Sequence, residues 1–322
     1  MRDLPHLRLT PLMFARTSPR RHVLALTLAA ACWGFGTVIS KRAVDEIPPL
    51  TLLPIQLGVS LVVLALLMRW RGVPFRDPSS SPILGRLGVL NPGLAYALGL
   101  LGLVYITASL AVMIWAFEPL LILALAAWFL HESIGRSLVA WSVVAVAGLV
   151  LVIGQPGSSW SPVGILLTIV GVACCAAYTV ITRRWLATAE STTQVILTQQ
   201  VYALAFALVL VVAVWLLGGA VRPEGVSTAG WASAIASGIL YYGLAYWFYL
   251  SALRHVPASL AAVSFYLIPI FGVVGAYLAL GERLEPSQWI GVGIVLTAIL
   301  FITRRTSATA AAAALALVSD PA

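Results

Sequence analysis

Residues 93–111 read GLAYALGLLGLVYITASLA, and residues 243–261 read GLAYWFYLSALRHVPASLA. Ten of these nineteen positions are identical, without a gap, at an offset of 150 residues. The same offset pairs Pro119 with Pro269 and Glu132 with Glu282. A match that extends over two apolar stretches indicates that the chain consists of two similar halves.

The beginnings of the two halves also correspond, at an offset of 142 residues. CWGFGTVISKR at 32–42 matches CCAAYTVITRR at 174–184. The first apolar stretch has a basic start and small residues, as a signal peptide does. Because it has a counterpart in the second half, we expect it to be part of the fold.

The composition indicates an integral membrane protein. Of the 322 residues, 61% are hydrophobic and only 9% are charged, and the mean hydropathy is +1.00. A soluble domain carries about 25% charged residues. The net charge of +8 is better explained by basic loops at the cytoplasmic face of a membrane than by nucleic-acid binding, for which no motif is present.

Ten apolar runs are long enough to cross a bilayer, which needs about 20 residues per helix. We therefore predict an all-α integral membrane protein in which ten transmembrane helices form two inverted five-helix repeats. The organisation expected is a basic cytoplasmic segment at 1–22, repeats at 23–154 and 162–303, and an alanine-rich tail at 306–322. The predicted spans are 23–40, 49–68, 83–104, 107–130, 138–154, 162–182, 194–217, 231–253, 258–280 and 287–303.

The inversion follows from the odd number of spans in each half, because the second half must enter the membrane from the opposite side. With the N-terminus inside, 15 of the 19 Lys and Arg residues lie in cytoplasmic segments and four lie outside. This bias predicts that both termini are cytoplasmic. Inverted repeats are typical of secondary transporters that expose one site to each side in turn.

These features resemble the drug/metabolite transporter superfamily, and specifically its ten-helix EamA-domain family. The resemblance covers about residues 23–305 and is carried by CWGFGTVISKRAV, by ASLAVMIWAFEPLLILALAAWFLHE and by its echo ASLAAVSFYLIPIFGVVGAYLALGE. The first half ends this motif in His-Glu, where Gly-Glu is usual. The resemblance implies a carrier of metabolites or drugs in a bacterial inner membrane, often an exporter, and does not transfer a substrate.

Glu118 is the most informative candidate residue, because it is the only acidic residue deep inside a predicted span. A carboxylate at the bilayer centre costs about 2.5–3.5 kcal/mol on insertion scales. In a water-filled cavity it would bind a cation, a proton or an amino group, and it could couple transport to protons. The alternative is a protonated side chain that hydrogen-bonds a neighbouring helix.

Prolines interrupt the predicted spans at equivalent depths. Pro119 and Pro269 each remove a backbone donor near the middle of a span, and Pro92 follows Asn91 in the third span. We predict hinges or kinked cavity walls at these positions, although proline in a membrane helix can also bend it without a further role.

An apolar pocket with a few polar groups is the usual site for a small molecule. Gln56 and Gln200 correspond across the repeat, and the pair would either bind a polar substrate or hold two helices together. Each aromatic candidate could instead serve only in packing. The other predicted cavity residues are Trp33, Asn91, Tyr96, Trp115, Tyr242, Tyr246, Phe265 and Tyr266.

Enzyme signatures are missing from the sequence. No GxxxxGK[ST] or HExxH motif occurs, the four histidines are scattered, and the three cysteines lie in apolar runs as small hydrophobic residues. We expect no enzymatic activity, no cofactor and no metal, and a small-molecule substrate and the lipid bilayer as partners. The alternative function is a membrane subunit that keeps this scaffold and transports nothing.

Overall fold

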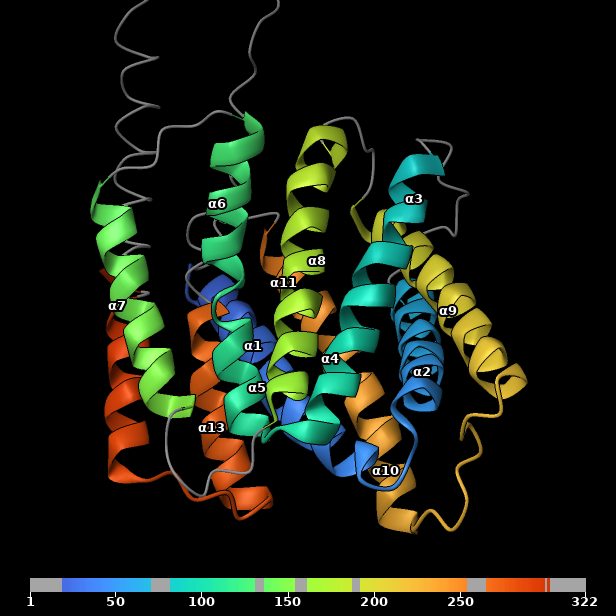
Figure 1. Cartoon of the computed structure of the whole chain (residues 1–322). Helices are drawn as coiled ribbons and strands as arrows, with labels where there is room; N and C mark the ends of the chain where they lie inside the picture. Colours follow the sequence, from blue (N-terminus) through green and yellow to red (C-terminus); the bar gives the residue numbers. More distant parts are fainter. Residues whose placement is uncertain are drawn as a thin grey trace, which may run out of the picture.

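The computed structural model describes residues 19–70, 82–130, 136–153, 161–186, 192–253, 265–298 and 300–301. Within these ranges every regular element is a helix (Figure 1). The all-α fold class predicted from the sequence is confirmed. The elements of the first half are α1 (Pro19–Val44), α2 (Pro49–Trp70), α3 (Pro82–Gly88), η1 (Val89–Leu94), α4 (Ala95–Tyr105), α5 (Ala108–Trp115), α6 (Glu118–Leu130) and α7 (Arg136–Ile153).

The second half repeats this order of elements. Its π-helical turn η2 lies at the same place as η1 in the first half, between the two segments of the third span. The segment before η3 lies outside the described residues. The elements are α8 (Pro162–Leu186), α9 (Thr192–Leu216), α10 (Thr228–Ser237), η2 (Gly238–Leu244), α11 (Ala245–Leu253), η3 (Phe265–Leu267), α13 (Ile268–Ala279) and a helix over 286–298.

The predicted fourth span, 107–130, is not one continuous helix. The structure ends α5 at Trp115 and begins α6 at Glu118. Pro119 is therefore the second residue of a new helix, where its missing N–H leaves no hydrogen bond unmade. The hinge or kink predicted at Pro119 takes the form of a break between two helices, and the apolar residues Ala116 and Phe117 do not indicate where the first helix ends.

The two halves run in opposite directions through the molecule. The Lys41 ammonium near the end of α1 donates to the Leu103 carbonyl near the end of α4, at 2.8 Å. Gly164, near the start of α8, packs against Tyr105 and Ile106 at that same end. Since α1 ends where α8 begins, the repeats are inverted, as predicted (Figure 1).

Each half completes the packing of the other. Helix α1 lies against α11, and its counterpart α8 lies against α4. Likewise α2 packs on η2, and its counterpart α9 packs on η1. The structure is thus one interleaved body with a twofold relation between its halves, and its centre lies where the two third spans meet.

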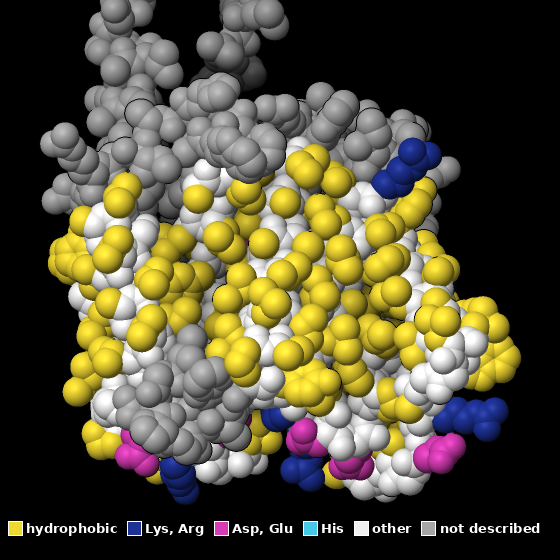
Figure 2. Space-filling view, viewed as in Figure 1, with side chains coloured by type: hydrophobic (Ala, Val, Ile, Leu, Met, Phe, Trp, Pro, Cys, Tyr) yellow, Lys and Arg dark blue, Asp and Glu magenta, His cyan; other side chains and the backbone are white. Residues whose placement is uncertain are grey.

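The outer surface suits a bilayer. Figure 2 shows hydrophobic side chains across the middle of the molecule, with acidic side chains along its lower edge and basic side chains at the lower edge and at the upper right. Large apolar side chains on different helices are exposed, among them Val143, Leu166, Val209 and Leu278. Five of the described helical stretches are long and apolar enough to cross a membrane by themselves.

Glu46, in the turn between α1 and α2, holds the start of α10. Its carboxylate accepts hydrogen bonds from the Ser227 amide at 2.7 Å and from the Ser227 hydroxyl at 2.9 Å. The hydroxyl and then the amide of Ser227 lower the pKa of Glu46 below its usual value. The ionised form is therefore favoured in the folded protein.

This bond predicts a loss of stability in acid. A lowered pKa means that the contribution of Glu46 is present above its unfolded pKa, near 4.3, and is lost as the pH falls through the folded value. Thermal unfolding of the detergent-solubilised protein at pH 7 and pH 3 would measure it. Glu46→Gln should unfold earlier than the wild type at pH 7 and show a smaller acid-induced decrease, whereas an unchanged decrease would contradict the prediction.

Candidate functional site

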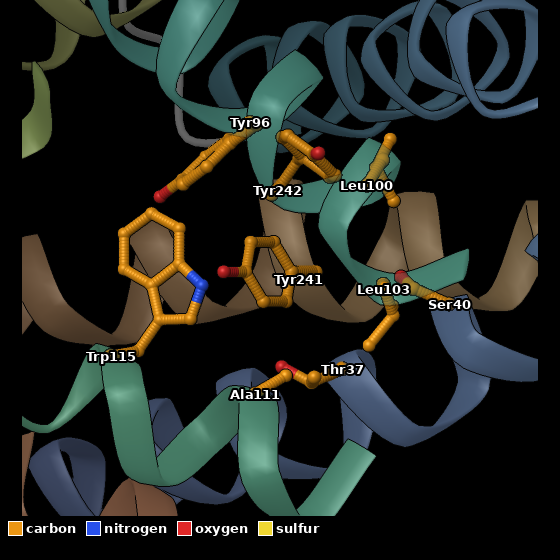
Figure 3. A pocket seen from close by; sticks show the side chains of 10 residues that line it. Thr37, Ser40, Tyr96, Leu100, Leu103, Ala111, Trp115, Tyr241 and Tyr242 are labelled. Atoms are coloured by element: carbon orange, nitrogen blue, oxygen red, sulfur yellow. The ribbon is translucent and has the colours of Figure 1, made fainter. Parts of the chain in front are cut away.

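A small cavity lies at the interface of the two halves, with a volume of about 30 Å³. Its walls come from α1, α4 and α5 of the first half and from η2 of the second (Figure 3). This volume is about that of one water molecule. The lining residues are Thr37, Ser40, Tyr96, Gly99, Leu100, Leu103, Ala111, Trp115, Tyr241 and Tyr242.

Aromatic rings form one side of this cavity. Tyr96 on α4 makes edge-to-face contacts with Trp115, Tyr241 and Tyr242, with ring centroids 5.3–5.6 Å apart. Figure 3 shows the hydroxyl of Tyr241 pointing toward the indole of Trp115. The three predicted residues Tyr96, Trp115 and Tyr242 therefore lie together, and Tyr241 joins them.

Tyr96 and Tyr246 meet at the centre of the repeat. Their hydroxyl groups are 2.9 Å apart and share a hydrogen bond. The two residues correspond to each other at the offset of 150, so the twofold relation between the halves passes close to this bond. If each half takes up the conformation of the other during transport, a hydrogen bond between equivalent residues can persist in both states.

Loss of either hydroxyl should have the same consequence. Tyr96→Phe or Tyr246→Phe removes one bond, worth about 0.5–1.5 kcal/mol, and lowers the free energy of unfolding in detergent by a similar amount. Because each variant breaks the same bond, the double variant should be no less stable than the worse single one. Tyr105→Phe, at an exposed position, is the control, and additive losses would contradict the assignment.

Three further predicted residues form a second aromatic cluster beside the cavity. Trp33 on α1 contacts Tyr246 at 5.5 Å and Phe265 at 5.3 Å between ring centroids, and it also contacts Tyr249. None of these residues lines the cavity described above. The Tyr96–Tyr246 hydrogen bond connects the two clusters.

Glu118 lies just beyond the cavity rather than in its wall. It is the first residue of α6 and is half-buried, and the Cys175 thiol on α8 donates a hydrogen bond to its Oε1 at 3.1 Å. Cys175, expected only as a small hydrophobic residue, is thus a polar partner from the other half. Trp115, the last residue of the preceding helix α5, lines the cavity.

The predicted helix breaks take different forms. In η1, Asn91 has an extended backbone (φ −147°, ψ 123°), its side chain is buried, and a cis peptide links it to Pro92. Pro119 and Pro269 each follow the first residue of a helix, α6 and α13 respectively. Pro119 and Pro269 therefore lie in the first turn of a helix. At Asn91, in contrast, the helical backbone is interrupted inside the third span.

The two predicted glutamines hold helices together. Gln56 donates from Nε2 to the hydroxyls of Ser40 at 3.0 Å and Ser237 at 2.7 Å. Gln200 accepts from the Ser60 hydroxyl at 2.8 Å and donates to the Tyr242 carbonyl at 3.1 Å. Both are fully buried. These bonds join α1, α2, α9, α10 and η2 directly behind the cavity wall.

Several lining residues were not predicted. Thr37 belongs to the repeated Thr-Val-Ile triplet, and Tyr241 is the counterpart of Asn91, so the repeat itself could have indicated both. Ser40, Gly99, Leu100, Leu103 and Ala111 carry no chemical signal in the sequence. Tyr266 lies in η3, and its side chain is outside the described residues. Within the described part of the chain, no three His, Cys, Asp or Glu side chains gather as a metal site would require.

The sequence model of the EamA-like transporter family matches the chain twice, at residues 20–154 and 162–304. The two matches cover almost all of the described helices. They begin and end close to the two halves that the repeat defines.

Full-length relatives carry transporter names. The Bacillus subtilis protein named uncharacterized transporter YvbV is 25% identical over 91% of this chain and 95% of its own length. An uncharacterized transporter of Archaeoglobus fulgidus is 25% identical over 88% of this chain and 98% of its own. A probable terminal-alkyne amino-acid exporter of Streptantibioticus cattleyicolor is 25% identical over 88% and 94%.

A protein of known crystal structure shares the fold. It superimposes with a TM-score of 0.63 over 90% of this chain and 99% of its own, at 19% sequence identity. At this identity the likeness concerns the fold alone. Two matches to one family and inverted halves around a central cavity agree, and the chain is a multi-pass membrane transporter that belongs to the EamA-like transporter family, within the drug/metabolite transporter superfamily.

Proposed function

We propose that this protein is a secondary active transporter that exports small organic metabolites, such as amino acids, related compounds or drugs, by alternating access. The observation that carries the proposal is the cavity between the inverted halves, whose walls come from both. Such an interface is where transporters with this kind of repeat place their substrate. The relative named as a probable amino-acid exporter supports the substrate class and the direction.

The conformation described here admits no metabolite. A cavity of about 30 Å³ holds one water molecule, whereas small-molecule sites usually measure about 300–1,000 Å³. Substrate binding therefore requires α1, α4 and α5 to separate from η2. The aromatic rings of Tyr96, Trp115 and Tyr241 would then offer flat apolar surfaces, with Thr37 and Ser40 as polar contacts on the opposite wall.

The predicted roles of the remaining residues belong to this proposal. Glu118 acts as the ionisable group, which takes up a proton or meets a cationic part of the substrate from behind Trp115. When the second aromatic cluster opens, aromatic surface becomes accessible to the substrate on Trp33, Tyr246, Phe265 and Tyr266. The helices bend at Asn91 and Pro92, and in the chain around Pro119 and Pro269.

We further propose that both termini are cytoplasmic and that the protein lies in a bacterial inner membrane. With the N-terminus inside, 15 of the 19 Lys and Arg residues lie in segments on the proposed cytoplasmic face. The turns on the other face carry Lys41, Arg42, Arg222 and Arg283. This smaller share of basic residues is typical of an external face.

Uptake into proteoliposomes tests the proposal. The purified protein would be given pooled amino acids and metabolites at two pH values, with empty vesicles as background. Saturable transport of one pool, with a rate that depends on pH, is expected. If a folded preparation transports none of the pools, while a related exporter in the same kind of vesicle transports one, the result would favour the alternative function, a membrane subunit that transports nothing.

A further inference from the structure

Glu282 makes a contact that the cavity and its aromatic residues do not explain. It follows α13 in the second half, and its carboxylate reaches across to the first residues of α5 in the first half. Oε1 accepts from the Ala108 amide at 2.8 Å, and Oε2 accepts from the Ser109 amide at 3.0 Å and the Ser109 hydroxyl at 2.6 Å. A carboxylate at the start of a helix also interacts favourably with the helix dipole.

The residues inside this contact form a plug. Val38 on α1, Ala108 on α5 and Ala276 on α13 are buried together in one small apolar cluster. One turn further along α13, Gly272 lies against the Val112 side chain so closely that a Cβ on Gly272 would come within 2.6 Å of it. The facing surfaces of α5 and α13 are therefore close-packed.

The cavity begins directly behind this plug. Thr37 is adjacent to Val38 in α1, and Ala111 and Trp115 follow Ala108 along α5, and all three line the cavity. The order from the surface inward is thus the Glu282 contact, the apolar cluster and the cavity. Among the described residues, the hydrogen bonds of Glu282 are the side-chain hydrogen bonds that join α5 to α13 and the turn after it.

We propose that Glu282 is the latch of one access gate. Its carboxylate holds the start of α5 against the second half and closes the cavity toward the face at which α4 ends and α5 begins. For the cavity to open to that face, Glu282 must leave Ala108 and Ser109. This inference rests on the proposed alternating-access function, because it assigns one of its two gates.

The location of the latch suits a contact that breaks in each cycle. The flanking residues Gly281 and Arg283 are exposed, so water can replace the three hydrogen bonds when the carboxylate is released. Arg283 itself stacks on the Tyr277 ring, at 4.0 Å from its centroid.

Accessibility of the cavity tests the latch. Ser40→Cys places a thiol in the cavity wall with little change in size, and a membrane-impermeant maleimide is applied from each side of the membrane in oriented vesicles. The same chain without this substitution gives the background from Cys32, Cys174 and Cys175. Transport of the accepted substrate is measured in the same vesicles.

Glu282→Gln should raise the rate of Ser40→Cys labelling from the latch face by about tenfold or more, because it removes the charge that three donors share. Glu285→Gln removes a carboxylate from the same loop and should change nothing. Ser109→Ala keeps the carboxylate and loses one donor, so a smaller increase in the labelling rate is expected. When it is combined with Glu282→Gln, Ser109→Ala should add no further increase.

Two results would overturn the latch. One is a transport-competent Glu282→Gln variant whose labelling from both faces equals that of the wild type, which would leave the proposed function standing. The other is an equal increase after Glu285→Gln, which would make the effect one of loop charge. If labelling changes as expected but the wild type transports nothing, the gate is supported and the transport proposal fails.

Discussion

Replacement of Glu118 with glutamine is expected to reduce transport in proteoliposomes by more than about 30-fold. Glutamine has nearly the same shape, and its amide oxygen can still accept the hydrogen bond from the Cys175 thiol. The fold should therefore persist, while the group can no longer ionise. Because the amide keeps this contact, the expected loss reflects the missing ionisable group, and a 30-fold change in rate corresponds to about 2 kcal/mol.

The pH dependence of transport separates the two roles of Glu118. If the carboxyl group carries the coupled proton, the residual rate of Glu118→Gln should not vary with pH, whereas the wild-type rate should. Glu224→Gln, which removes a carboxylate from an exposed loop, is the matched control. Full, pH-dependent transport by Glu118→Gln would make the residue a structural hydrogen-bond acceptor and would exclude it from the mechanism.

Replacement of Gly88 with alanine should have the largest effect on folding. Gly88 ends α3 where it crosses α9, and an added Cβ would overlap the Gln199 carbonyl oxygen and lie 2.6 Å from its carbonyl carbon. These are backbone atoms and cannot rotate away. Overpacking usually costs about 1–3 kcal/mol, and we expect a loss at or above the upper end, seen as poor recovery and early thermal unfolding in detergent.

The repeat provides a graded comparison for this prediction. Gly238, the counterpart of Gly88, would place its Cβ 2.9 Å from the Gln56 carbonyl oxygen, so Gly238→Ala should be damaging but less so. Gly58, inside α2, has no atom within 4 Å of an added Cβ. Gly58→Ala should be neutral or stabilise by up to about 1 kcal/mol. Equal stability of all three variants would contradict the close crossings of α3 with α9 and of η2 with α2.

The architecture could be predicted because it depends on quantities that a sequence carries directly. Length and apolar composition determine how many helices fit a bilayer, and the repeat at 93–111 and 243–261 with five spans per half determines the inversion. A hinge or kink at Pro119 was predicted, but the end of α5 at Trp115 could not be seen, because Ala116 and Phe117 are as apolar as their neighbours. The single predicted span over 107–130 therefore wrongly placed Trp115 and Glu118 on one helix.

The candidate site was less accessible to prediction, since it depends on how helices cross. Tyr96, Trp115 and Tyr242 were found because large polar aromatics in apolar spans are conspicuous. Cys175 looked like one more small hydrophobic residue, and only the packing of α8 beside α6 brings its thiol to Glu118, 57 residues away.

The exchange of partners between the halves also bears on how the protein is made. Helix α1 finds its neighbours α10, α11 and α13 only in the second half, and α4 rests on α8. When the ribosome has delivered the first five spans, α1 still lacks the surfaces that bury Trp33 and Val38. The early helices therefore remain in the bilayer without these partners until more than one hundred further residues, through α13, have been synthesised. Assembly of this transporter is in that sense a single late event rather than the stepwise addition of two finished halves.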